Sequence, residues 1–299
     1  MRCALILTLT SLAACQPDAG LSPAMEAHRG GAGLAPQNSR SAIVASMELG
    51  VEVVEFDLVL TSDGIPVVAH DPWLDDAHCA RQDGSPIGDR VYLQDLSLQQ
   101  ALGDYLCGGI PDPDFPDAAV VAEPLMTLDE LLAAAAGHPD VGLHLDVKVE
   151  PGMTADGDAF AEAILSRVQQ ASLENPWYMS ANLSEVIQAF EGWGEGEGME
   201  VRSSLIWPRF PPDSSSTAVA LQTELGVGLG LLDMIGHAER AGADGVALPW
   251  QLADRRRIVD ARAAGLQVQL WTLNTSDLLD TYSRWPVDAL ITDYPLGAP

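Results

Sequence analysis

The feature that most constrains the fold of this chain is an alternation of short apolar, strand-like segments with helical segments. Strand, helix, strand units predict parallel pairing, because parallel neighbours need a long crossover connection. The pattern therefore predicts an α/β protein folded as a closed (β/α)8 TIM barrel, with an open doubly wound sheet as the alternative. The eight strand-like segments are residues 25–28, 53–60, 141–149, 177–180, 199–207, 245–248, 266–273 and 288–293.

The alternation is interrupted after the second strand. Residues 72–124 have no helical or strand period and are rich in Gly, Pro and Asp, which predicts an inserted loop or small subdomain. Thr127 and Glu130 then form a capping-box pattern at the start of a helix. Composition also predicts two loops, one rich in Gly and Glu at residues 192–198 and one rich in Pro and Ser at residues 208–217.

The first residues have the pattern of an export signal. Arg2 precedes an apolar run that is too short to span a membrane and that ends in Leu-Ala-Ala-Cys. This order resembles a bacterial lipobox, in which the chain is cleaved before a cysteine that becomes acylated; a plain secretory signal is the alternative. We expect a lipoprotein signal peptide at residues 1–14, a linker after the lipidated Cys15 at residues 15–24, and the barrel at residues 25–299.

The expected mature protein is an exported lipoprotein that faces the periplasm or the outside and meets the membrane only through its lipid. Gln16 after the cysteine resembles a signal for the outer membrane. The net charge of -28 argues against binding to nucleic acid, which needs a basic patch. Outside the cytoplasm, Cys79 and Cys107 are expected to form a disulfide inside the insertion, with two free thiols as the alternative.

Two carboxylates lie on one face of the second strand. Glu55 and Asp57 point to the same side of an extended backbone, and burying both is unfavourable unless a cation lies between them. The third strand repeats this spacing with His144, Asp146 and Lys148, the only lysine of the chain. We therefore expect a divalent-metal site rather than an edge strand whose carboxylates face water.

Other polar residues fall where the expected strands end, and these ends meet at one face of a barrel. Carboxylates suit a hard cation, arginine and lysine suit a phosphate, and histidines exchange protons near neutral pH. Together they are the equipment for metal-assisted cleavage of a phosphodiester. The further residues at these strand ends are His28, Arg29, His70, Trp271, Asn274 and Asp293.

Seven short motifs follow one another in order along residues 26–295. They are His28-Arg29-Gly30, Pro36-Gln37-Asn38-Ser39, Glu55-Phe56-Asp57, the run from Thr61 to His70-Asp71, Asp146-Val147-Lys148, Trp271-Thr272-Leu273-Asn274 and Thr292-Asp293-Tyr294-Pro295. Each motif is weak alone, but together they resemble the glycerophosphodiester phosphodiesterase family.

The resemblance implies hydrolysis of a glycerophosphodiester to glycerol 3-phosphate and an alcohol, with one divalent cation, Ca2+ or Mg2+, as cofactor. As in related barrel phospholipases, the glycerol 2-hydroxyl would attack first and water would open the cyclic phosphate. The implied roles are metal binding by Glu55, Asp57 and Asp146, proton transfer by His28 and His70, phosphate binding by Arg29 and Lys148, and an apolar wall for the glycerol from Trp271.

Two positions depart from the family pattern. Asp146 stands where glutamate is usual, so a shorter carboxylate must reach the metal, and Gln37 stands where glutamate is common. Neither change removes a proton-transfer residue, so we expect an active enzyme.

Two other functions stay open. A relative that cleaves lysophospholipids would need an apolar channel, and a lipoprotein without activity would only bind a phosphorylated ligand. Retention of both histidines argues against the second, because binding alone does not require proton carriers. The residues expected to line a channel are Trp73, Trp207, Phe210 and Trp250.

Overall fold

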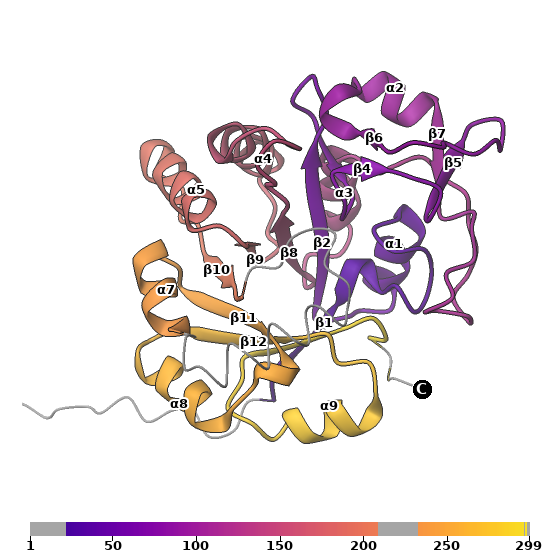
Figure 1. Cartoon of the computed structure of the whole chain (residues 1–299). Coiled ribbons are helices and arrows are strands. Elements are labelled where there is room, and N and C mark those ends of the chain that lie inside the picture. The colour runs from indigo at the N-terminus through magenta and orange to yellow at the C-terminus, as the bar shows by residue number, and fades with distance from the viewer. Residues whose placement is uncertain (1–21, 209–232, 296, 298–299) are drawn as a thin grey trace, which may run out of the picture.

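Eight parallel strands close into a barrel in the computed structural model, which describes residues 22–208, 233–295 and 297 (Figure 1). The first strand pairs with both the last strand and the second, so the sheet has no open edge at the closure. The (β/α)8 prediction is confirmed and the open-sheet alternative is wrong. In order around the barrel the strands are β1 (Ala24–Ala27), β2 (Val53–Leu60), β8 (Gly142–Val147), β9 (Trp177–Ala181), β10 (Ser203–Ile206), β11 (Gly245–Pro249), β12 (Gln267–Trp271) and β13 (Ala289–Thr292).

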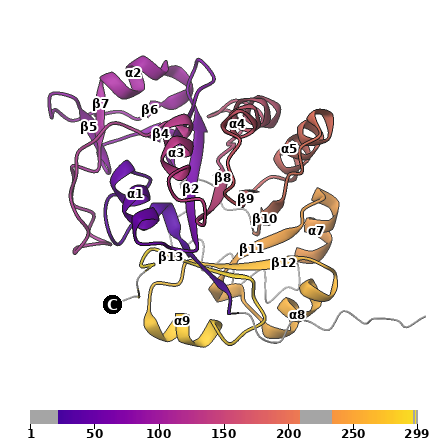
Figure 2. The same ribbon diagram turned by 180° about the vertical axis from the view of Figure 1, so that it is seen from behind.

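Helices surround the barrel on its outer side (Figures 1 and 2). They begin at side-chain caps: Ser39 accepts a hydrogen bond from the backbone N–H of Ala42, and Thr127 and Glu130 form the expected capping box. The helices are α1 (Arg40–Glu48), α3 (Leu128–Ala135), α4 (Gly157–Ala171), α5 (Ser184–Glu197), α7 (Met234–Ala241), α8 (Arg255–Ala263) and α9 (Ser276–Tyr282), with 3-10 turns η1 (His28–Gly30), η2 (Leu93–Asp95) and η3 (Trp250–Leu252).

The main core lies between the strands and these helices. Alternate residues of β2, among them Phe56 and Leu58, are fully buried in this layer, as are Leu143 and Leu145 of β8. The intervening residues of the same strands point into the barrel, because side chains alternate along an extended backbone. The apolar half of each strand thus fixes which residues face the barrel interior.

The insertion after β2 forms a small subdomain beside α1 and α3 (Figures 1 and 2). The far end of β2 pairs antiparallel with β3 (Pro66–Val68), which leads into the subdomain. A second apolar cluster that includes Leu93 and Tyr105 fills it, and a disulfide joins Cys79 to Cys107 across two paired strands. The elements are β4 (Trp73–Leu74), β5 (Cys79–Arg81), β6 (Val91–Tyr92), α2 (Leu98–Gly103) and β7 (Tyr105–Cys107).

The loop predicted at residues 192–198 is wrong, because α5 continues to Glu197. Trp193 packs against the main core, and a Cβ on Gly194 would lie 2.7 Å from a Val201 methyl group, so the glycine permits close packing rather than a loop. The helix ends at Gly198, whose φ of 70° is left-handed. The strand expected at residues 199–207 is correspondingly shorter.

Several sequence predictions lie outside the described residues. They are the signal peptide at residues 1–14, the lipidated Cys15 with most of its linker, the loop at residues 208–217 apart from Pro208, and Phe210. Within the described part of the chain, no helix combines the length and the apolar character needed to cross a membrane.

Candidate active site

A cavity opens at the carboxyl ends of the barrel strands, and its two sides differ in chemistry. One side carries charged residues from η1, β2 and the end of β8. Ile206 and Ala247 of β10 and β11 lie across the barrel from them, and Ile291 of β13 adds a third apolar side chain. Trp271 at the end of β12 also lines the cavity, and its indole N–H has no hydrogen-bond acceptor among the described residues. The cavity can therefore hold a ligand with one charged and one apolar face.

Three buried carboxylates meet on the charged side. Oxygen atoms of Glu55, Asp57 and Asp146 all lie within 4.8 Å of one another. Asp57 and Asp146 are direct neighbours across β2 and β8, which brings the shorter Asp146 side chain into the cluster despite the missing methylene. Oδ1 of Asp146 is buried and has no hydrogen-bond partner within the described residues. Such a set of oxygen atoms fits a hard divalent cation.

Electrostatics at the cluster favour a further positive charge. Burial raises the pKa of Glu55 well above its usual value, and the charges of Asp57 and Asp146 raise it further. Burial also acts to raise the pKa of Asp57, but Lys148, His70 and Arg29 outweigh it and hold that pKa far below its usual value. One carboxylate of the cluster is thus poorly compensated by the protein alone.

Two cations border the carboxylates. Lys148 Nζ lies 2.9 Å from Asp57 Oδ1 and also donates to Asp146. Burial disfavours its charge, but Asp146 and Asp57 raise the Lys148 pKa above its usual value. Arg29 is held through its backbone N–H, which donates to Glu55 at 2.6 Å, and its Nε lies 3.7 Å from Asp57 Oδ2. Both cations therefore stay charged and face the same cavity as the carboxylates.

The two candidate proton-transfer histidines have matching environments. His28 Nδ1 lies 2.7 Å from Asp293 Oδ1, and His70 Nδ1 lies 2.8 Å from Asp71 Oδ1. A carboxylate accepts from Nδ1–H, which leaves the other ring nitrogen for a ligand. Burial and the charge of Arg29 lower the His70 pKa, so its ring is neutral at neutral pH. Both histidines line the same cavity as Glu55 and Asp146 of the carboxylate cluster.

Four positioning contacts were not predicted from the sequence. Asp71 and Asp293 hold the histidines as described above, and the Asn274 amide in turn donates to Asp293 Oδ2 at 2.5 Å. Asn38 donates to Asp57 Oδ2 at 2.6 Å and accepts from the Asp57 backbone N–H at 3.0 Å. Asn38 has a φ of 56°, a left-handed conformation that asparagine tolerates. The signals for it in the sequence are its place directly before the cap of α1 and its membership of the Pro36-Gln37-Asn38-Ser39 motif.

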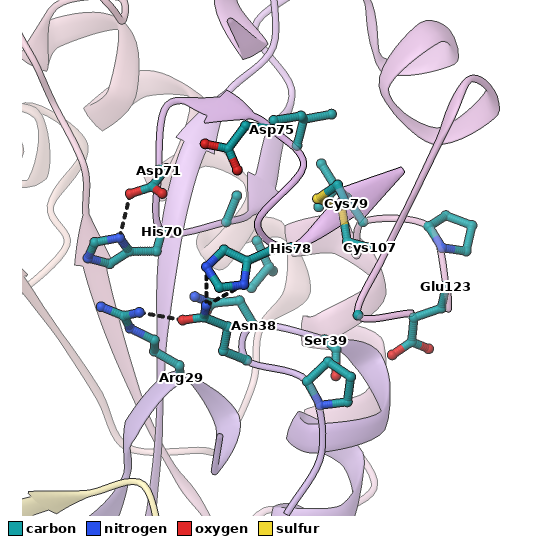
Figure 3. Close-up of a pocket in the computed structure, with 18 of the residues that line it drawn as sticks. Arg29, Asn38, Ser39, His70, Asp71, Asp75, His78, Cys79, Cys107 and Glu123 are labelled. Atoms are coloured by element: carbon teal, nitrogen blue, oxygen red, sulfur yellow. Dashed lines mark hydrogen bonds and ion pairs between the residues drawn. A yellow bond between two sulfur atoms is a disulfide. The ribbon is translucent and has the colours of Figure 1, made fainter. Parts of the chain in front are cut away.

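A second pocket lies between the barrel and the insertion, next to the first (Figure 3). Arg29 and His70 border both pockets. Gln37 accepts a hydrogen bond from the Arg29 guanidinium, and its amide nitrogen lies 3.1 Å from His78 Nε2. Gln37, which stands where the family commonly has glutamate, therefore connects the barrel to the subdomain.

The tryptophans expected to form an apolar channel do not share one location. Trp73 lines the second pocket, with the Arg90 guanidinium 3.9 Å from its ring centre. Trp207 packs against His237 and Trp250 packs against Tyr282. These contacts give no support to a single channel built from the described tryptophans.

Comparisons with known proteins agree with this geometry. The chain matches the model of the "Glycerophosphoryl diester phosphodiesterase family" over residues 28–193 and 206–296. It is 24% identical over 269 residues to YhdW of Bacillus subtilis (strain 168), named "Putative glycerophosphodiester phosphodiesterase", covering 90% of this chain and 93% of that protein.

Two solved structures share the fold. A "Putative glycerophosphoryl diester phosphodiesterase" from Silicibacter pomeroyi DSS-3 has a TM-score of 0.78 and 22% identity, covering 92% of this chain and 91% of that one. An Oleispira antarctica phosphodiesterase in complex with the product sn-glycerol-3-phosphate has a TM-score of 0.68 and 20% identity, covering 92% and 94%. Because the family model spans most of its length, the chain belongs to the glycerophosphoryl diester phosphodiesterase family of enzymes.

Proposed function

We propose that this protein hydrolyses glycerophosphodiesters to glycerol 3-phosphate and an alcohol, using a bound divalent cation, Ca2+ or Mg2+. The observation that carries the proposal is the meeting of three elements at one cavity. They are two histidines, each held by a carboxylate, two cations, and a cluster of three further carboxylates, of which Glu55 and Asp146 line the cavity. The product in the Oleispira antarctica structure is the same phosphate ester.

Glu55, Asp57 and Asp146 would hold the cation, which when bound withdraws charge from the phosphate oxygens. Arg29 and Lys148 complement the remaining negative charge of the phosphate, because both guanidinium and ammonium groups donate hydrogen bonds to phosphate oxygens. The apolar side of the cavity excludes water from the glycerol carbons.

His28 and His70 would be the acid–base pair. In both rings Nδ1 faces a carboxylate, so Nε2 accepts or donates the transferred proton. The lowered pKa of His70 favours its neutral ring, which supports His70 as the base that accepts the proton of the attacking hydroxyl. His28, beside Asp293, would then protonate the leaving alcohol, which leaves a cyclic phosphate. In the second step His28 would accept a proton from water and His70 would return its proton to the glycerol 2-hydroxyl as the ring opens, so both rings regain their starting state.

The test is release of glycerol 3-phosphate from glycerophosphocholine, measured with added Ca2+, with added Mg2+ and with chelator. We expect turnover with at least one cation, none with chelator, and a loss of about 10²- to 10⁴-fold in both His28→Ala and His70→Ala. His138→Ala is the matched control, because His138 lies in the turn before β8, at the opposite end of that strand from Lys148. A protein that binds glycerol 3-phosphate but turns over no diester with any cation would contradict the proposal.

Lysophosphatidylcholine distinguishes the nearest alternative. Turnover of this substrate alone would assign the protein to lysophospholipid cleavage instead.

We also propose that the protein is an exported lipoprotein, anchored to a membrane through Cys15. The disulfide between Cys79 and Cys107 supports an oxidising compartment. Cys15→Ser is expected to release the protein from the membrane fraction, and an unchanged membrane association would contradict the anchor.

A further inference from the structure

The insertion contacts the phosphate-binding side of the active site through the side chain of Gln37. Gln37 Oε1 accepts a hydrogen bond from the Arg29 guanidinium, and Gln37 Nε2 lies 3.1 Å from His78 Nε2. Gln37 precedes α1 of the barrel, whereas His78 directly precedes β5 of the insertion. Arg29 and His78 both line the second pocket (Figure 3). A side chain of the insertion therefore acts on Arg29 through one intermediate residue.

The two neighbours of Gln37 determine which way its amide points. An arginine side chain only donates hydrogen bonds, so the amide oxygen must face Arg29. The NH2 group then faces His78 and donates to a ring nitrogen that carries no hydrogen. A glutamate at this position could accept from Arg29, but it would have no hydrogen to donate to His78. The amide is thus the group that satisfies both neighbours.

The orientation of the Arg29 guanidinium depends on this contact. The backbone N–H of Arg29 donates to Glu55, but its side-chain Nε lies 3.7 Å from Asp57 Oδ2, which is too far for a hydrogen bond. Nε is buried and has no hydrogen-bond acceptor in the described part of the chain. Among the described residues, Gln37 accepts the only hydrogen bond that this side chain donates. Gln37 therefore holds the guanidinium in place.

Gln37 holds the guanidinium without adding a charge. The second pocket already contains the carboxylates of Asp71, Asp75 and Glu123. A glutamate in place of Gln37 would set a further negative charge against the Arg29 guanidinium, and through it against a phosphate bound there. Coulombic repulsion is proportional to the charge of the ligand, so a doubly charged phosphate would be repelled twice as strongly as a singly charged one.

We propose that Gln37 orients Arg29 without neutralising it, and so determines how strongly the site binds a doubly charged phosphate monoester relative to a singly charged diester. The proposal rests on the proposed function, in which Arg29 binds the phosphate. A phosphate monoester carries nearly two negative charges above its second pKa of about 6, whereas a diester carries one. The product glycerol 3-phosphate is therefore the ligand that gains most from Gln37, and it competes with the substrate.

The test measures binding of two matched ligands by titration calorimetry at pH 8 with Ca2+ or Mg2+ present. They are propane-1,3-diol phosphate and its methyl ester, which differ by one charge and lack the 2-hydroxyl that would attack. We expect the wild-type protein to bind the doubly charged ligand about 10-fold more tightly. Gln37→Glu should weaken binding of the methyl ester about 10-fold and binding of the doubly charged ligand about 100-fold, because each ligand charge contributes the same repulsion.

Three further variants separate charge from position. His78→Ala and Gln37→Ala disturb the orientation of Arg29 but add no charge, so each should weaken binding of both ligands by the same factor. Gln188→Glu is the matched control, since Gln188 lies on the outer helix α5 and its amide donates to the backbone carbonyl of Arg240. It adds the same charge away from Arg29 and should leave both affinities unchanged.

Turnover of glycerophosphocholine by the same samples separates this proposal from the proposed function. If Gln37→Glu weakens binding of both ligands equally, or of neither, or if the wild-type protein binds the doubly charged ligand no more tightly, the role of Gln37 is refuted and turnover still supports the enzyme. If binding depends on charge as expected but no diester is cleaved with any cation, the proposed function fails while the role of Gln37 in binding stands. If the wild-type protein binds neither ligand, the role of Gln37 is refuted.

Discussion

Replacement of Asp293 by Asn tests whether His28 depends on its carboxylate partner. Asp293 Oδ1 accepts from His28 at 2.7 Å, and Oδ2 accepts from the Asn274 amide at 2.5 Å. Burial acts to raise the Asp293 pKa, but the charge and hydrogen bond of His28 outweigh it and lower that pKa, so the group is ionised at neutral pH. Asp293→Asn keeps the shape and removes one of two acceptors.

Neither orientation of the new amide satisfies both neighbours. With its oxygen toward His28, its NH2 group faces the NH2 group of Asn274. With its NH2 group toward His28, Nδ1 must be unprotonated, so the doubly protonated ring that would donate a proton to the leaving alcohol is disfavoured. Loss of a charge-assisted hydrogen bond corresponds to about 1.5–3 kcal/mol, and an unsatisfied buried donor to a further ~1–3 kcal/mol. At 1.36 kcal/mol per tenfold change, we expect kcat/KM to fall by about 10²- to 10⁴-fold.

The assay is the release of glycerol 3-phosphate, repeated in a His28→Ala background. Asp293→Asn should have little further effect there, because its partner is already absent. Asp288→Asn is the matched control, since Asp288 binds Arg262 and the Val268 backbone rather than a cavity residue. An Asp293→Asn variant that retains a third or more of the wild-type kcat/KM, or that loses as much in the His28→Ala background, would refute the reasoning.

Three other perturbations have defined outcomes. Replacing both Cys79 and Cys107 by Ala opens a loop of 28 residues and should lower the free energy of unfolding by about 3–4 kcal/mol in a denaturant titration; no change would contradict it. Asn38→Ala removes two hydrogen bonds to Asp57 and places Ala at a φ of 56°, so thermal unfolding should show a loss of about 2–4 kcal/mol, with Asn38→Gly losing less. In chelator no cation offsets the raised pKa of Glu55, so folding favours the protonated form of this side chain. The stability that Glu55 contributes is therefore fully present below pH 4.5, the usual pKa of a glutamate, and is lost as the pH rises toward the raised pKa. The free energy of unfolding of Glu55→Gln should therefore increase relative to that of the wild type as the pH rises. Added cation should restore the stability of the wild type. A stability difference between the two proteins that does not change with pH would contradict this prediction.

The sequence was sufficient for the features that depend on local periodicity. Alternation along β2 and β8 placed Glu55, Asp57 and Asp146 on one face, and the structure brings these three carboxylates together. The order of strand-like and helical segments likewise predicted the barrel and the interrupting insertion. Both properties follow from side-chain direction and from connection length, which a sequence displays directly.

What could not be predicted depends on contacts distant in sequence or on packing. Gly and Glu are poor guides at the end of α5, because Trp193 and the close approach of Gly194 to Val201 override local preference. The pairing of His28 with Asp293 joins residues 265 positions apart. Strand ends bring such residues to the same face, but the individual hydrogen bonds depend on the register at which the barrel closes.

Closure of the barrel has a consequence for the order in which the protein becomes competent. Because β1 pairs with β13, the first strand of the domain gains one of its two neighbours only when the last strand is in place. A nascent chain, or a chain cut by a protease before β13, would leave β1 with an open edge and His28 without Asp293. Under the proposed mechanism an incomplete chain lacks the acid–base pair, so hydrolysis would begin only after synthesis of the whole domain had finished.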